Sequence, residues 1–349
     1  MIYRGKRVLV TGACGTVGAG LVSRLSSESS LGVAEIVGLD NNESALFFLD
    51  QQYIDNDRVK FYVADVRDRD ELNHRMSGID IVFHAAALKH VILCEQSPGQ
   101  AVQNNIIGVQ NVIACAIENS VERVIFTSSD KAVNPTNVMG TSKLMGEKLI
   151  SAANTYSQTN KTVFASTRFG NVLGSNGSVV PVFRNQIAAG GPITLTDPGM
   201  TRFVMSLEQS VRLVLDTAEL ASGGEVFVTK MPVIRITDLA KAMTNMLAPA
   251  YGYDPVDIKI NEIGSKPGEK LYEELMSNEE TRRAVELPDY FSVLPAFTDA
   301  YRDVGYDYPE LVSDSVDRPY VSSDEPVLSL SDIESFLSQH NVLGPIPGS

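Results

Sequence analysis

The alternation of short apolar segments with helical stretches constrains the fold of this chain more than any other feature. Six segments rich in apolar and β-branched residues occur in the first half of the chain, at residues 7–11, 35–40, 59–65, 80–84, 123–128 and 163–169. Such alternation predicts βαβ units whose parallel strands form one sheet covered by helices. A further segment, residues 225–229, is expected to return to that sheet. The predicted fold class is α/β, a Rossmann-like doubly wound parallel sheet with a smaller, mostly C-terminal α/β lobe.

Charge and composition exclude several classes of protein. A net charge of -14 argues against binding to nucleic acid, because contacts with a phosphate backbone need clustered Lys and Arg. No apolar run approaches the roughly 20 residues that span a bilayer, and the N-terminal residues do not resemble a secretory signal. Cys14, Cys94 and Cys115 lack the spacing of a metal site. We therefore expect a cytoplasmic protein without a membrane span or a bound metal.

A glycine-rich turn follows the first apolar segment. Gly12, Gly15 and Gly18 recur every third residue there, just before a helical stretch. Glycines at this point let the backbone approach a pyrophosphate, which accepts hydrogen bonds from N–H groups at the start of the helix. The residues between and beside them that are expected to contact a dinucleotide are Cys14, Thr16 and Val17. Glycine-rich turns also serve plain helix packing. The nucleotide-binding interpretation therefore depends on the position of this turn directly after a predicted strand.

An acidic residue, Asp40, ends the second apolar segment, about 20 residues beyond the glycines. A carboxylate at this position accepts hydrogen bonds from both hydroxyls of an adenosine ribose and repels a 2′-phosphate. The following Asn41 and Asn42 provide no cation for such a phosphate, so the sequence favours NAD over NADP. The alternative is that Asp40 is a helix N-cap.

The third and fourth apolar segments end in residues that extend the predicted cofactor site. Asp65 and Val66 are expected beside the adenine, and Ala85, Ala86 and Ala87 offer small side chains where a dinucleotide passes close to the backbone. For both groups, packing at the end of a strand is the alternative interpretation.

A polar stretch, residues 127–148, follows the fifth apolar segment. It contains Ser129, Asp130 and Lys131, then a turn at a proline, then a helical stretch that carries Lys143. This order places an acid, an amine and a second cation at the carboxyl edge of a parallel sheet, where α/β enzymes bind their ligands. Strands also end in such residues to solvate a loop or to cap a helix, but the nucleotide-binding turn favours catalysis.

Together, the glycines, Asp65-Val66 and the Lys143 helix resemble the extended short-chain dehydrogenase/reductase superfamily. Longer blocks more closely resemble the nucleotide-sugar 4,6-dehydratases of polysaccharide biosynthesis, at residues 84–91, 130–140, 168–175, 200–203 and 266–275. The resemblance covers about residues 6–281. It implies NAD as the cofactor and assembly into a homo-oligomer, and family precedent favours UDP-N-acetylglucosamine as the nucleotide-sugar substrate.

The chain departs from the superfamily at Met139, four residues before Lys143, where a tyrosine is usual. Many members of the dehydratase branch also have methionine there, and a thioether cannot accept the proton of a substrate hydroxyl. The base for the C4 hydroxyl is left open between Asp130 acting through a water and the hydroxyls of residues 127–129. A second departure is Lys266-Pro267-Gly268-Glu269, where family members often have Arg-Pro-Gly-Glu.

The resemblance implies a reaction in which C4 of the sugar is oxidised, water is lost across C5 and C6, and the hydride returns to C6. In this scheme Lys131 takes the C5 proton, Asp130 protonates the departing C6 hydroxyl, and Lys143 binds the nicotinamide ribose with Ser129 among its polar partners. Burial near Lys143 would lower the pKa of Lys131, and nearby cations would keep Asp130 ionised, so the pair is expected to titrate as one coupled unit.

The matched blocks also imply contacts with the substrate. Asn171 and Arg202 are expected to bind its pyrophosphate and Glu269 its ribose. The other residues assigned to the substrate are Val180, Pro181 and Phe183, as an apolar wall for the base, and Lys89, which reaches the sugar or phosphate. The alternative for Asn171 and Arg202 is that they tie the two lobes together.

The same blocks suggest a division into two domains. The predicted NAD-binding domain comprises residues 1–170 and 203–232, and the predicted substrate lobe comprises residues 171–202 and 233–349, with an irregular C-terminal extension. In that extension only residues 330–337 carry a clear helical pattern, with Ser331 or Asp332 as the cap.

Two other functions share these features. A nucleotide-sugar 4-epimerase would have the same fold, NAD and C4 oxidation, but epimerases of this superfamily normally keep the tyrosine and have no Asp-Lys pair. A dinucleotide-sensing protein without catalysis is the second alternative, and Met139 is the only feature that favours it.

Overall fold

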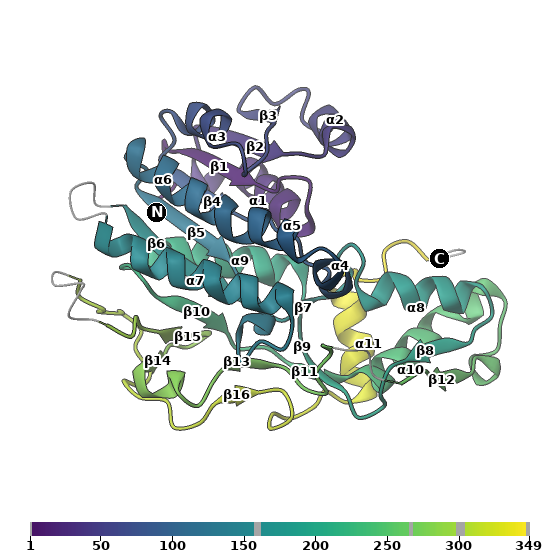
Figure 1. The fold of residues 1–349 in the computed structure, drawn as a ribbon. Coiled ribbons are helices and arrows are strands. Elements are labelled where there is room, and N and C mark those ends of the chain that lie inside the picture. Colours follow the sequence, from purple (N-terminus) through teal and green to yellow (C-terminus); the bar gives the residue numbers. More distant parts are fainter. Residues whose placement is uncertain (1, 157–161, 265–267, 298–303, 347–349) are drawn as a thin grey trace. The chain divides into compact units, whose positions relative to one another are not determined.

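The computed structural model describes residues 2–156, 162–264, 268–297 and 304–346. The chain divides into two compact units, which are described separately (Figure 1). Unit one comprises Met1–Arg168, Val211–Thr229 and Met276–Pro319, and unit two comprises Phe169–Ser210, Lys230–Leu275 and Tyr320–Ser349.

Unit one is built on a sheet whose strand order is β14-β15-β10-β6-β5-β4-β1-β2-β3. The strands are β1 (Arg7–Thr11), β2 (Glu35–Asp40), β3 (Val59–Val63), β4 (Ile81–His84), β5 (Arg123–Thr127), β6 (Val163–Arg168), β10 (Val226–Thr229), β14 (Ala284–Glu286) and β15 (Tyr290–Val293). All pairs from β3 to β10 are parallel. Parallel strands covered on both faces need apolar side chains on both faces, which explains the continuous apolar runs in the sequence. The predicted Rossmann-like α/β fold class is confirmed.

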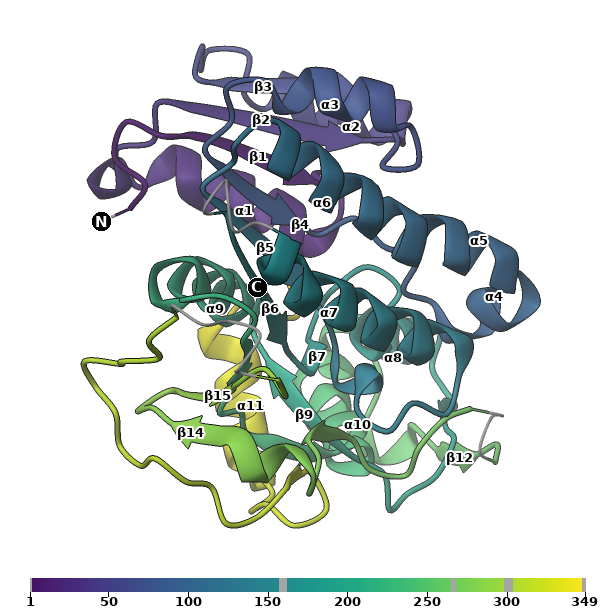
Figure 2. The same ribbon diagram turned by 60° about the vertical axis from the view of Figure 1, so that its left-hand side comes forward.

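Helices cover both faces of this sheet. The helices of unit one are α1 (Thr16–Ser27), α2 (Glu43–Gln51), α3 (Arg69–Met76), α4 (Val91–Gln96), α5 (Pro98–Val102), α6 (Gly108–Glu118), α7 (Val138–Tyr156) and most of α9 (Leu207–Leu220), with short turns η1 (Ser29–Leu31), η2 (Gln103–Ile107), η3 (Asp130–Ala132) and η7 (Glu280–Arg283). Helices α3, α6 and α7 lie on one face, and α1 lies on the other (Figure 2). In the ranges that the structure describes, no helix combines the length and the apolar character needed to cross a membrane.

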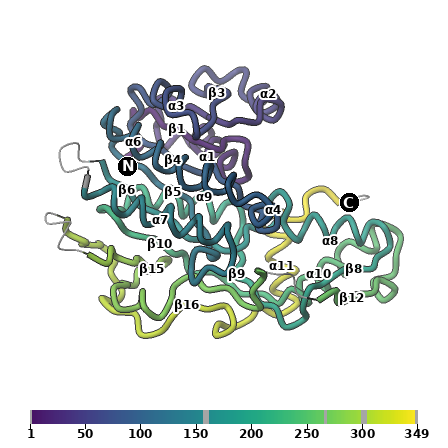
Figure 3. The backbone as a smooth tube through the Cα atoms, viewed as in Figure 1, coloured from purple at the N-terminus to yellow at the C-terminus, as the bar shows by residue number. Residues whose placement is uncertain are grey.

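Residues 276–319 belong to unit one, which corrects their assignment to the substrate lobe. β15, which lies beside β10 in Figure 3, pairs antiparallel with it, Val293 opposite Val226 and Tyr290 opposite Thr229. β14 pairs antiparallel with β15 in turn. The returning strand satisfies the backbone groups at an edge of β10 that would otherwise be exposed. Residues 203–210 lie in unit two instead, because β9 (Thr201–Met205) pairs there with its own neighbours.

Unit two contains short sheets packed on helices. Its elements are β7 (Asn171–Val172), β8 (Ile193–Leu195), β9, β11 (Val233–Arg235), β12 (Ile260–Glu262), most of β13 (Glu274–Met276), β16 (Tyr320–Val321), α8 (Val179–Ala188), α10 (Ile236–Leu247), α11 (Leu330–Gln339), η5 (Pro249–Tyr251) and η6 (Pro255–Asp257). The sheets are β11-β9-β7, β12-β8 and β13-β16. The cap of α11 is Ser329, whose hydroxyl accepts from the backbone N–H of Asp332, so both predicted caps were wrong. The capping box therefore starts at the residue immediately before the predicted helical stretch, and Asp332 is its N3 residue.

Candidate functional site

The glycine turn after β1 has almost no space for side chains. Gly12 has φ +72°, and a Cβ added to it would lie 2.7 Å from the backbone nitrogen of Ala86. A Cβ on Gly18 would lie 2.0 Å from the carbonyl oxygen of Gly12. Gly15, the N-cap residue of α1, has no side chain to cap the helix, so a phosphate can take that role. The turn therefore has the shape of a pyrophosphate cradle.

The carboxylate of Asp40 is fixed against this turn. Its Oδ2 accepts from the backbone N–H of Cys14 at 2.9 Å, and its Oδ1 accepts from the backbone N–H of Asn42 at 3.0 Å. Asn42, not Asp40, is the N-cap of α2, because its side chain accepts from the backbone N–H of Ala45. A carboxylate has about four acceptor positions, so Asp40 retains capacity for ribose hydroxyls.

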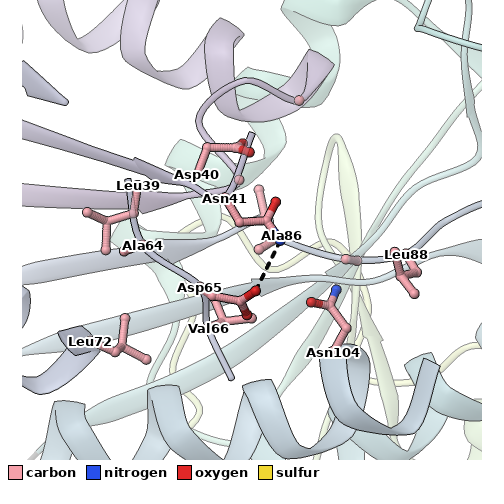
Figure 4. Close-up of a pocket in the computed structure, with 14 residues that line it drawn as sticks. Leu39, Asp40, Asn41, Ala64, Asp65, Val66, Leu72, Ala86, Leu88 and Asn104 are labelled. Carbon is pink, nitrogen blue, oxygen red and sulfur yellow. Dashed lines mark hydrogen bonds between the residues drawn. The ribbon is translucent and has the colours of Figure 1, made fainter. Parts of the chain in front are cut away.

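A pocket of about 170 Å³ lies at the carboxyl ends of β1 to β4 (Figure 4). It is lined by Gly12, Gly15, Leu39, Asp40, Asn41, Ala64, Asp65, Val66, Leu72, Ala85, Ala86, Ala87, Leu88 and Asn104. None of these lining residues is Lys or Arg. Among the residues assigned to the cofactor, Cys14, Thr16, Val17, Gly18 and Lys143 do not line this pocket. The glycine cradle, the uncapped helix and the Asp40 carboxylate fit NAD, and an anionic rim without a lining cation does not suit a 2′-phosphate.

Asp65 is held as an acceptor by a neighbour that sequence reasoning missed. Arg67 donates to it from Nε at 2.9 Å, from Nη2 at 2.6 Å and from its backbone N–H at 2.9 Å, and Asn41 adds a bond at 3.2 Å. The side-chain bond from Arg67 keeps the pKa of Asp65 well below its usual range. Any adenine amino group at this position would share the carboxylate with Arg67.

Lys143 is buried on α7 and points to the end of β5. Its Nζ donates to the carbonyl oxygen of Thr127 at 2.9 Å and lies 4.7 Å from the centre of the Phe126 ring. Burial lowers the pKa of Lys143 to about 8, and the negative charge of Glu147 partly opposes this shift. Lys143 is thus a desolvated cation at the carboxyl edge of the sheet.

The predicted acid–amine pair forms on η3, immediately after β5. The Oδ1 of Asp130 accepts from the hydroxyl of Ser129 at 2.6 Å, from the backbone N–H of Lys131 at 2.9 Å and from its Nζ at 3.0 Å. The Oδ2 of Asp130 is buried and has no hydrogen-bond partner among the described residues. A Cβ on Gly140 would lie 2.1 Å from the carbonyl oxygen of Lys131, so α7 packs directly on the backbone of the pair.

Met139 serves packing rather than proton transfer. It is buried in a small apolar cluster with Cys94 and Ala101, against which Val91 and Val138 also pack. No hydroxyl is therefore supplied from the position where the superfamily has its tyrosine.

Asn105, in the π-helical turn η2, is a second residue that sequence reasoning missed. It accepts from the backbone N–H of Leu88 at 2.8 Å, and its amide donates to the carbonyl oxygen of Leu88 and to Ser142 Oγ, both at 2.9 Å. Ser142 donates in turn to the carbonyl oxygen of Met139 at 2.7 Å. Asn105 thus joins the loop that lines the pocket to the helix that carries Lys143. π-Helical turns are frequent at functional sites, but they have no simple sequence pattern.

The residues assigned to the substrate lie mainly in unit two. Arg202 donates to the carbonyl oxygens of Thr201 at 2.7 Å and of Lys270 at 2.8 Å, and its Nε lies 3.7 Å from Glu273. Its Nη2 is 3.9 Å from Glu269, which places these two assigned residues together. These bonds give Arg202 a structural role within unit two.

The remaining assigned residues have different surroundings. Val180 and Phe183 are buried in the core of unit two, because α8 buries the face that carries residues 180, 183 and 187, and their assignment to a pocket wall stays a prediction. Pro181 is half-buried, Lys89 is exposed, and the Oδ1 of Asn171 is buried without a hydrogen-bond partner among the described residues. Lys266 and Pro267 of the matched block lie outside the described residues.

Comparisons with known proteins cover most of the chain. A family model described as polysaccharide biosynthesis protein matches residues 8–295. An uncharacterized membrane protein of Methanocaldococcus jannaschii is 48% identical over 301 residues, which is 86% of this chain and 89% of that protein. A UDP-glucose 4-epimerase of Rickettsia canadensis is 40% identical over 299 residues, 84% of each chain. The solved structure of Pen from Bacillus thuringiensis superimposes with a TM-score of 0.90 and 38% identity, covering 98% of this chain and all of that one.

Proposed function

Because this chain belongs to the polysaccharide biosynthesis protein family, we propose that it is an NAD-dependent nucleotide-sugar 4,6-dehydratase acting on UDP-N-acetylglucosamine. The observation that carries the proposal is the Asp130–Lys131 pair, in which a buried carboxylate with one unbonded oxygen lies beside an amine. A reaction confined to C4 has no need for a second acid and base at this edge, whereas elimination of water across C5 and C6 needs both.

The chain's own residues would divide the proton transfers between them. NAD, when bound, supplies a temporary acceptor for the hydride of C4. Once C4 is a ketone, the C5 proton is acidic enough for the Nζ of Lys131 to remove. The Oδ1 of Asp130 already accepts three hydrogen bonds, so a proton carried by this carboxyl belongs on Oδ2, which would deliver it to the departing C6 hydroxyl.

The proton of the C4 hydroxyl needs another acceptor, because Met139 has none. The available groups are Asp130 through a water and the hydroxyls at the end of β5. Of these, Thr127 donates to the carbonyl oxygen of His84 at 3.3 Å, and the buried Ser128 Oγ has no hydrogen-bond partner among the described residues.

The proposal is tested by supplying UDP-N-acetylglucosamine to the NAD-loaded protein in D₂O. The expected product is lighter than the substrate by one water, apart from incorporated deuterium, and carries solvent deuterium at C5. Lys131→Ala is expected to abolish this product while NAD still binds. A product without deuterium at C5 would refute the elimination scheme.

A 4-epimerase is the alternative that a specific observation favours, since the Rickettsia canadensis relative is named a UDP-glucose 4-epimerase. An epimer keeps the mass of its substrate and has no ketone, so the same mass spectra separate the two reactions. A protein that only senses a dinucleotide would convert none of the nucleotide sugars, and Lys131→Ala would change nothing that can be measured.

A further inference from the structure

A buried cluster of charges lies one helical turn from Lys143. Arg168, the last residue of β6, donates to Glu147 of α7 from Nε at 2.8 Å and from Nη2 at 2.6 Å. The same guanidinium donates to Glu280 of η7 from Nη1 at 2.9 Å and from Nη2 at 2.8 Å. The side chains of Arg168, Glu147 and Glu280 are 2%, 3% and 8% exposed.

This cluster contains two carboxylates and one guanidinium, so by itself it holds one excess negative charge away from water. An uncompensated buried charge is strongly destabilising. Glu147 and Lys143 are four residues apart on α7 and therefore lie on the same face of the helix. The four buried groups are electrically balanced when Lys143 carries its proton. Arg283 also lies 3.7 Å from Glu280, but it is shared with the exposed Glu279 at 3.5 Å.

We propose that Glu147, held in place by Arg168, is a positioning residue that keeps Lys143 protonated and fixed on the carbonyl oxygen of Thr127. Glu280, in the segment of residues 276–319, contributes by holding the Arg168 guanidinium in place. The catalytic use of a charged Lys143 rests on the proposed function, whereas the stabilisation of its protonated form by this cluster does not.

The other titratable groups around Lys143 cannot replace Glu147. Burial lowers the pKa of His84 on β4 to about 3, so its ring is neutral. Burial raises the pKa of the Cys94 thiol on α4, so it is neutral as well. Asp130 and Lys131 on η3, which packs on α7, offset each other as an ion pair. Glu147 is also the largest described influence opposing the effect of burial on Lys143.

The test is an NMR titration of NAD-loaded protein labelled with ¹³C at the lysine Cε, with the Lys143 signal assigned by its loss in Lys143→Met. The wild-type signal is expected to titrate near the pKa of about 8 that burial gives Lys143. In Glu147→Gln the midpoint should fall by about one pH unit or more, the usual effect of losing a nearby opposite charge. An unchanged midpoint would overturn the proposal.

Two further variants keep the test decisive if Glu147→Gln does not fold. Glu280→Gln removes the excess negative charge but keeps the two bonds between Arg168 and Glu147, so a lower midpoint is again expected and an unchanged one contradicts the charge balance. Glu147→Asp keeps the charge and should restore the wild-type midpoint. Glu208→Gln is the control, because Glu208 is exposed in the first turn of α9 and outside the cluster, and it should cause no shift.

The result is independent of the reaction. A shifted midpoint in a protein that eliminates no water from any nucleotide sugar would refute the proposed function and support the role of Glu147. Water elimination with an unshifted midpoint would support the proposed function and refute the role of Glu147.

Discussion

At the scale of single residues, the nucleotide-binding turn requires glycines, because it has no room for a Cβ atom. Gly18 is helical and has ordinary backbone angles, yet a Cβ there would lie 2.0 Å from the carbonyl oxygen of Gly12. The requirement therefore comes from the close approach of α1 to the turn and not from backbone conformation. This is why the spacing of the glycines predicts their role.

We expect Gly18→Ala to weaken NAD binding about tenfold or more, because the turn must move and such overpacking costs about 1–3 kcal/mol. Titration calorimetry with NAD measures the change. Gly99→Ala is the matched control, since no atom lies within 4 Å of a Cβ at that position and its affinity should equal that of the wild type. Equal affinities for both variants would refute the role of Gly18.

Other residues of the site could not be found from the sequence, because their roles arise from contacts between distant segments. Asp40 was recognisable as the acid that ends a strand near the glycines, but Asn105 contacts Leu88 and Ser142, which are 17 and 37 residues away. Arg67 is close to Asp65 in the chain, yet nothing in the local pattern shows that its side chain turns back.

At the scale of elements, the parallel strands were predictable because burial on both faces requires apolar runs. β14 and β15 were not, since strands of three and four residues among polar and proline residues show no clear period. The π-helical turn η2 also escaped prediction, although it joins α5 to α6 and carries the amide that links the pocket to α7.

We expect Asn105→Ala to destabilise the protein by about 2 kcal/mol, because it leaves the backbone N–H and carbonyl of Leu88 without these bonds in a part-buried setting. It should also raise the KM for NAD, since Leu88 lines the pocket. Thermal melts and initial rates at varied NAD measure the two effects. Gln103→Ala, an exposed position in the same turn, should change neither, and a variant that melts lower with an unchanged KM would limit Asn105 to stability.

At the scale of the whole molecule, unit one is assembled from three separate stretches of the chain. Its first stretch supplies the glycine turn, the acid–amine pair and Lys143, and its last stretch brings Glu280 to Arg168. The glycine turn, the acid–amine pair and Lys143 could be located from the sequence because their motifs are local. Residues 276–319 were misplaced because their membership depends on pairing with β10 and on an ion pair that bridges 112 residues.

This assembly should make unit one sensitive to acid. Burial alone would raise the pKa of Glu280, but the Arg168 guanidinium and the backbone N–H of Ser277 lower it to about 2. A carboxyl whose pKa is lower in the folded state stabilises the fold above its unfolded pKa of about 4.3, and the contribution is lost as pH falls through the folded value. The difference between the folded and unfolded pKa values of Glu280 corresponds to about 3 kcal/mol in the free energy of unfolding. The wild-type Tm is therefore expected to fall between about pH 5 and pH 2.

Glu280→Gln should lower the Tm at pH 7 and flatten its decline over that acidic window, because the variant has no proton to bind at this position. Glu279→Gln, whose carboxylate is exposed, should keep the steep decline of the wild type. Scanning calorimetry at successive pH values measures both. If Glu280→Gln loses stability with acid as steeply as the wild type, the acid sensitivity arises from other carboxylates, and the ion pair with Arg168 does not govern how the returning segment is held.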